Sequence, residues 1–127
     1  MSDAPPPETL GILLISGGHE RAHYAFVLAA GGAAVGRNVV LFATNEGCRA
    51  LLRDLDPDAR DTAIQAAGVA SLAELRGAAV ELGVRLLACD AGLRMAALDP
   101  AALLPSVEVA GVPTFLSATR RGQILTL

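Results

Sequence analysis

Cys89 is the residue of this chain whose type and position best suit chemistry. It directly follows the apolar segment VRLLA and directly precedes a segment that we predict to be helical. A thiolate is the nucleophilic form of cysteine, and the amide dipoles at the start of a helix stabilise it. Asp90 opposes this effect because a neighbouring negative charge disfavours a second one, whereas Arg94 could offset Asp90. Position alone leaves two interpretations open, a reactive thiol and a buried structural cysteine.

A second pattern, from His19 to His23, matches the H-E-x-x-H signature of zinc proteases. In those enzymes both histidines lie within a helix, a third ligand comes from elsewhere, and the glutamate acts as a base. This chain has only two histidines, and its 127 residues leave no second lobe to form a peptide cleft. His19 also stands at the very start of the expected helix, where Glu20 suits the positive helix end. We therefore predict no metal site and no metalloprotease activity.

Ser16, Gly17 and Gly18 form a small-residue turn after the first apolar segment. Glycines in this position can hold a phosphate on the amides at a helix start. The stretch matches neither G-x-G-x-x-G nor a Walker loop, and the chain contains no lysine. We interpret it as a tight turn with an optional anion site, and we predict no cofactor.

Short apolar segments alternate along the chain with segments of helical spacing. The expected strands are residues 10–15, 39–43, 84–88, 107–109 and 124–127. The expected helices are residues 19–36, a segment starting near Cys48, and residues 71–82, 91–98 and 113–121. Such alternation favours right-handed crossovers and a parallel sheet. We predict one flavodoxin-like α/β domain over residues 10–127, with a five-stranded parallel sheet in the order 2-1-3-4-5 and helices on both faces.

Two segments stand apart from this alternation. Residues 1–9 read as a proline-rich lead-in, and residues 53–66 as a charged, proline-broken surface excursion. The excursion is the best candidate for a lid or an insertion. The sequence leaves open whether it covers Cys89 or contacts a neighbouring molecule.

The predicted sheet places the candidate residues at one edge. Ligands of open α/β sheets bind outside the carboxyl ends of the strands, where the strand order reverses. With the order 2-1-3-4-5 the reversal lies between strands one and three, so the loop after strand one should face an accessible Cys89 sulfur. The supporting or binding residues that we assign to this rim are Ser16, Gly17, Gly18, Asn45, Cys48, Asp90, Gly92 and Arg94. For Cys48, packing is favoured over a role as thiol partner of Cys89, because a disulfide needs Cα atoms within ~7 Å.

Composition excludes several classes of function. The net charge is −3 with scattered basic residues, which gives no electrostatic footprint for nucleic acid. No apolar run approaches the ~20 residues needed to span a membrane. Two cysteines without a secretory pattern suggest a reducing cytoplasm. Because 53% of residues are hydrophobic and only 18% charged, we expect part of the surface to be buried in a homo-oligomer.

The segment GVRLLACDAGLRMAAL, followed by VEVAGVPTFLSATRRGQILTL, resembles the DsrE/DsrF/DsrH-like family, including its peroxiredoxin-like members. In that family a helix ending in A-x-E-x-G-V leads into a strand, a cysteine and a short helix. Here Ala79, Glu81, Gly83 and Val84 match the first part, and the V-x-V-A-G-V segment around Gly111 matches the second. The front half fits as well, through its long alanine-rich helix and the segment VVLFATNEG.

This resemblance implies a small flavodoxin-like protein that assembles into trimers or hexamers. It further implies that Cys89 accepts a sulfane sulfur as a persulfide from a protein donor and passes it to a protein acceptor, without a metal or organic cofactor. Two features depart from the family pattern, the acidic Asp90 beside the cysteine and the second thiol, Cys48. The alternative function is a non-catalytic binding or assembly module. Thiol peroxidase activity is disfavoured because no P-T-x-x-C arrangement precedes either cysteine.

Overall fold

The apolar segments form one parallel sheet in the computed structural model, which describes residues 8–127. Its strands are β1 (Thr9–Leu14), β2 (Asn38–Ala43), β3 (Arg85–Cys89), β4 (Glu108–Ala110) and β5 (Gln123–Thr126). Five parallel strands in an α/β arrangement confirm the predicted fold class. The expected lead-in falls largely outside the described residues, and Thr9 already belongs to β1.

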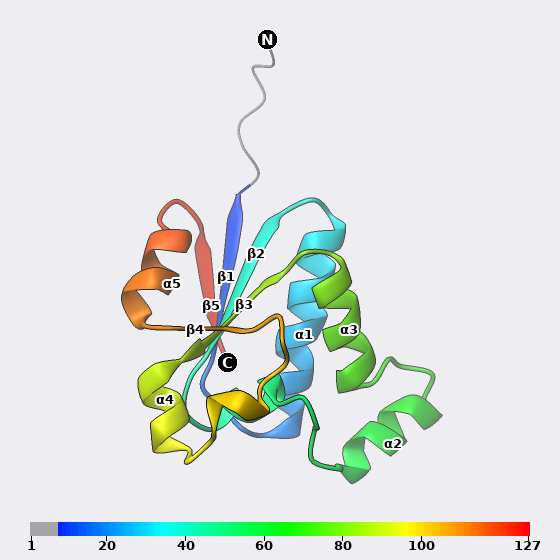
Figure 1. Cartoon of the computed structure of the whole chain (residues 1–127). Coiled ribbons are helices and arrows are strands. Elements are labelled where there is room, and N and C mark those ends of the chain that lie inside the picture. Colours follow the sequence, from blue (N-terminus) through cyan, green and yellow to red (C-terminus); the bar gives the residue numbers. More distant parts are fainter. Residues whose placement is uncertain (1–7) are drawn as a thin grey trace.

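Helices connect consecutive strands and also cap their carboxyl ends (Figure 1). The α-helices are α1 (His19–Ala34), α2 (Ala59–Ala66), α3 (Leu72–Glu81), α4 (Asp90–Met95) and α5 (Val112–Ala118). Two short 3-10 helices, η1 (Asn45–Leu51) and η2 (Pro100–Ala102), complete the set. The capping box predicted at the start of α3 is present, with Ser71 and Glu74 bonding each other's backbone amides. No helix within residues 8–127 combines the length and apolar character needed to cross a membrane.

The strands lie in the order β4-β3-β2-β1-β5. Strand β1 therefore pairs with β2 and β5, whereas the expected order 2-1-3-4-5 paired it with β2 and β3. Three successive crossovers move the chain in one direction, and the last returns it across the sheet to β5. The order reverses between β1 and β5, so the loop after β1 lies beside the end of β5, with Ile15 N–H bonded to the Leu127 carbonyl at 2.9 Å. It does not face Cys89, because β2 lies between β1 and β3.

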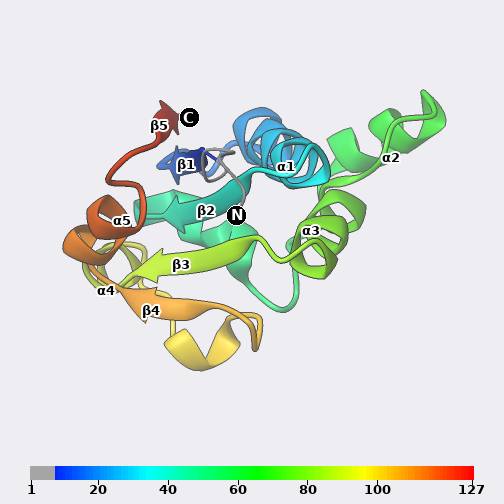
Figure 2. The same cartoon turned by 90° about the horizontal axis from the view of Figure 1, so that it is seen from above.

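The direction of each crossover decides which face its helix covers. Right-handed crossovers that advance the same way place α1 and α3 together on one face, whereas the return crossover places α5 on the other (Figure 2). Beneath α1 and α3 lies the larger buried cluster, which includes Ile12, Phe26, Leu41 and Leu86. A smaller cluster lies beneath α5. Helices therefore cover both faces, as predicted, but unequally.

The charged excursion contains a helix that the sequence pattern did not predict. Asp58 caps α2 by accepting a hydrogen bond from the Arg60 amide at 2.9 Å. No residue of α2 is buried, and the helix projects from the body of the molecule (Figures 1 and 2). Its apolar side chains are too few to announce an amphipathic helix, so the proline and the charges dominated the sequence signal.

Candidate functional site

Cys89 is the last residue of β3 and the N-cap residue of α4. In the sheet it pairs in register with Ala110 of β4. The expectation of an open sulfur is wrong, because Cys89 is only 7% exposed. Its side chain belongs to the smaller cluster, with Val40, Phe42, Leu87 and Phe115. The thiol therefore lies at the carboxyl edge of the sheet, on the face that α5 covers.

Cys48 lies in η1 and is completely buried. Its thiol donates a hydrogen bond to the Ala43 carbonyl at 3.5 Å, and it packs in the larger cluster, not the one that contains Cys89. Burial raises the pKa of Cys48 to about 11, and negative charge on the nearby Cys89 adds to the rise. Cys48 is thus a neutral packing residue at physiological pH, as the favoured interpretation of the sequence expected.

Asp90 and Arg94 form an ion pair one turn apart on α4, with an N···O distance of 2.9 Å. Both side chains are exposed, so solvent screens the pair and its contribution to stability is small. The pairing answers one question that the sequence raised, because Arg94 offsets the negative charge next to Cys89.

Gly92 and Asn45 bring α4 and η1 together next to the cysteine. A Cβ atom on Gly92 would lie 2.4 Å from the Asn45 amide nitrogen and 2.5 Å from Thr44 Oγ1. Asn45 has a positive φ of 51°, a conformation that asparagine tolerates better than most residues. Both residues, expected to line a binding rim, instead hold the close contact between the two elements.

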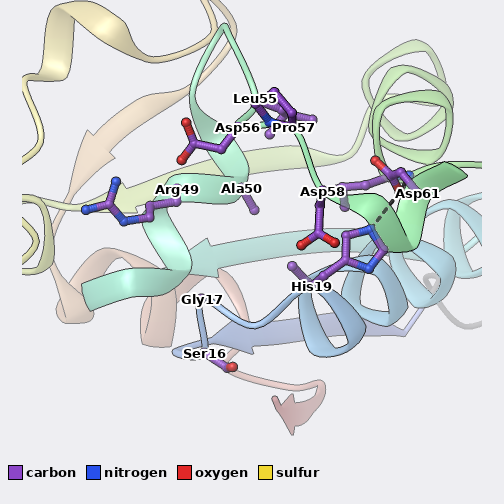
Figure 3. A pocket seen from close by; sticks show the side chains of 12 residues that line it. Ser16, Gly17, His19, Arg49, Ala50, Leu55, Asp56, Pro57, Asp58 and Asp61 are labelled. Carbon is purple, nitrogen blue, oxygen red and sulfur yellow. Dashed lines mark hydrogen bonds and ion pairs between the residues drawn. The ribbon is translucent and has the colours of Figure 1, made fainter.

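The turn after β1 belongs to a different place on the rim, a cavity of about 110 Å³ (Figure 3). Ser16 and Gly17 line one side of the cavity and the excursion lines the other. Its remaining lining residues are His19, Ala22, Arg49, Ala50, Leu55, Asp56, Pro57, Asp58, Asp61 and Leu72. Gly18 lies outside the lining, where its amide donates to Ser16 Oγ at 3.1 Å. The cavity lining does not include Cys89, so the structure separates the predicted rim residues into two groups.

The two histidines of the zinc-protease pattern bind α1 to the excursion and to the segment that follows it. His19 Nε2 donates to the Asp61 carboxylate at 2.6 Å (Figure 3), and His23 Nε2 donates to the Ala70 carbonyl at 2.8 Å. Burial acts to raise the pKa of Asp61, but the hydrogen bonds from His19 and the Leu72 amide outweigh it and the net pKa is lowered. Within residues 8–127, no three histidine, cysteine or acidic side chains are grouped so that they could hold a metal ion. The pattern thus marks a structural contact between distant segments.

Sequence reasoning missed three residues that shape these places. Asp61 pairs with His19, and Phe115 packs on the sheet face to which Cys89 belongs. Arg76 donates hydrogen bonds to backbone carbonyls at the end of η1 and just beyond it. Each of the three contacts residues that are at least 23 positions away in the sequence. A local signal that could have indicated a helix start in this region is Asp58, three residues before Asp61, because aspartate is a favoured N-cap residue.

The fold and the site together define an α/β protein with a covered cysteine at the carboxyl edge of a parallel sheet. The chain belongs to the DsrE/DsrF/DrsH-like family, whose model matches residues 49–126. This range includes Cys89 and three of the five strands, and it begins one residue after Cys48. A search of curated protein sequences finds no match.

Two solved structures share the fold over nearly the whole chain. The ychN protein from E. coli is 14% identical, with a TM-score of 0.75, and the match covers 94% of this chain and 99% of that one. A protein of unknown function, MTH1491 from Methanobacterium thermoautotrophicum, is 20% identical, with a TM-score of 0.68 and the same coverage of both chains. At these identities the likeness defines the fold.

Proposed function

We propose that the protein is a cytoplasmic sulfur carrier that holds a sulfane sulfur on Cys89 as a persulfide. The observation that carries this proposal is the position of Cys89, at the end of β3 and the start of α4, in a chain of the DsrE/DsrF/DrsH-like family. Cys48 is an unsuitable carrier because burial keeps it protonated.

The proposed transfer has two balanced steps. The Cys89 thiolate attacks the outer sulfur of a donor persulfide, forming Cys89–S–SH and releasing the donor as a thiolate. An acceptor thiolate then attacks the outer sulfur of Cys89–S–SH, taking that sulfur and leaving the Cys89 thiolate. Each step exchanges one sulfur–sulfur bond for another, so neither a metal nor an external oxidant is required. Donor and acceptor are proposed to be protein thiols.

Loading with sulfur tests this proposal directly. After incubation with a cysteine desulfurase and cysteine, we expect the protein to gain the mass of one sulfur atom, and peptide mapping should place it on Cys89. The Cys48→Ser variant should load like the parent, whereas Cys89→Ser should not load. With a pKa of about 11, Cys48 is ionised in only about one molecule in ten thousand at pH 7, so its own modification should be slow there and should rise about tenfold with each pH unit up to about pH 11. Equal loading of Cys89→Ser would refute the carrier role.

The cavity favours a second candidate, a ligand-binding module without thiol chemistry. Its walls combine apolar side chains such as Leu55 and Leu72 with the carboxylates of Asp56 and Asp58. Small-molecule sites commonly have this mixed lining. Under this alternative, Cys89→Ser would keep full function in cells.

We also propose that copies of the chain associate through exposed apolar side chains. The exposed large apolar residues include Tyr24, Val35, Met95, Val109, Val112, Leu116 and Ile124. Burying part of this surface would explain a composition that is unusually apolar for a small monomer. Sedimentation velocity at micromolar concentration should give a mass of three or six chains. A monomer under these conditions would contradict the proposal.

A further inference from the structure

We propose that α5 is a movable cover over Cys89, latched by Phe115, and that it must lift before a donor or an acceptor can reach the thiol. This inference rests on the proposed carrier function and names the step that controls access to the same sulfur. It also accounts for a reactive residue that is 93% covered in the resting structure.

The first argument is the placement of α5. Ala110, the register partner of Cys89, is followed by Gly111, and α5 begins at the next residue. From there the chain returns across the sheet to β5, over the face to which the Cys89 side chain belongs (Figure 2). The covering helix therefore starts beside the cysteine that it shields.

The second argument is how lightly α5 is attached. Phe115 is the only buried residue within the helix, and its ring stacks on Phe42 with centroids 5.0 Å apart and planes inclined by 15°. Val112 and Leu116, on the same helix, are exposed. By contrast, α1 buries seven residues on the opposite face. An element held by so few buried contacts opens at a lower free energy than the rest of the fold.

The third argument is the space on the sheet, above Gly11, that the Phe115 side chain occupies. A Cβ atom on Gly11 of β1 would lie 3.1 Å from Phe115 Cζ and 2.6 Å from Thr119 Cγ2, so the glycine leaves space for both side chains. Thr119, just after α5, is buried and donates to the Phe115 carbonyl at 2.8 Å. Withdrawal of the Phe115 ring from this space removes from the sheet the one residue of α5 that is buried.

Native-state alkylation of Cys89 measures the opening. The Cys48→Ser background leaves a single thiol, and N-ethylmaleimide is the probe. We expect Phe115→Ala to react at least about tenfold faster than this background, because the cover opens more often. Ser117→Ala is the matched control, since Ser117 lies on the same helix, is exposed and is not among the apolar residues proposed to associate, and its rate should stay within about twofold. The more conservative Phe115→Leu should fall between the two, and it serves as the test if Phe115→Ala does not fold.

The dependence of the rate on urea separates lifting of α5 from global unfolding. A local opening exposes little surface, so the alkylation rate of the background protein should depend only weakly on urea below the unfolding transition. Two outcomes would overturn the cover: alkylation as fast as a free thiol in the background protein, or a rate that follows global unfolding in every variant. N-ethylmaleimide needs no persulfide chemistry. Fast alkylation of Phe115→Ala without any sulfur loading would therefore refute the carrier role and leave the cover intact.

Discussion

Replacing Gly92 with alanine is expected to lower the free energy of unfolding by about 3 kcal/mol, because overpacking costs this much where the backbone must move. The added Cβ would lie 2.4 Å from the Asn45 nitrogen and 2.9 Å from the Thr44 Cα atom. These are backbone atoms, so no side-chain rotation can relieve the clash. Helix α4 would have to separate from η1, and the chain around Cys89 would move with it.

Chemical denaturation monitored by circular dichroism measures this loss. Gly77→Ala is the matched control, because Gly77 lies within α3 and a Cβ there meets no atom within 4 Å. That variant should raise the free energy of unfolding by about 0.5 to 1 kcal/mol, since alanine favours the helix. If Gly92→Ala proves as stable as the parent, the packed contact between α4 and η1 is wrong.

Replacing Arg76 with alanine should cost about 3 kcal/mol, because buried carbonyls lose a charged donor. The Arg76 side chain is buried and donates to the carbonyls of Ala50 at 2.9 Å and Leu52 at 2.6 Å, with a longer contact to Arg53 at 3.5 Å. No carboxylate pairs with Arg76 among the residues that the structure describes. Burial lowers the pKa of Arg76, because desolvation disfavours the charged guanidinium. This desolvation offsets part of the stability that the hydrogen bonds contribute.

Because the hydrogen bonds of Arg76 stabilise the fold and the desolvation of its charge opposes them, a second variant is needed to separate the two effects. Arg76→Met keeps most of the side-chain volume but removes the donors, so it separates the hydrogen bonds from the packing. We expect Arg76→Met to lose most of the stability that Arg76→Ala loses. Arg85→Ala is the control, since Arg85 forms an exposed pair with Glu108, and it should change the free energy of unfolding by less than about 1 kcal/mol. An Arg76→Met variant at least as stable as the parent would mean that desolvation outweighs the three hydrogen bonds.

These two residues bear on function because they fix the framework around the proposed carrier thiol. Gly92 allows α4 to dock on η1, and Arg76 holds the carbonyls at the end of η1 and just beyond it. With this side anchored, α5 is the covering element with the fewest buried residues near Cys89. The proposed sulfur transfer therefore depends on a rigid edge of the sheet and on one covering helix, α5, that has a single buried residue.

The sequence by itself determined the five strands, most of the helices and the location of the cysteine along them. Hydrophobic periodicity and the glycine, proline and capping signals are local properties of the sequence. The strand that leads into Cys89, the helix that ends near Gly36 and the capping box at Ser71 were therefore all predictable. The family resemblance was likewise readable from the segments on either side of Cys89, and the family match over residues 49–126 confirms it.

Only the tertiary structure decided how these elements are arranged around the thiol. A hydrophobic period does not encode the direction in which a crossover advances, so it could not place β1 between β2 and β5. Nor could it assign Ser16 and Cys89 to separate places on the rim, or pair His19 with Asp61 across 42 positions. The burial of Cys89 has the same origin. Whether its side chain is exposed to water or buried in the cluster with Phe115 depends on which face the last helix covers, and that follows from the return of the chain across the whole sheet.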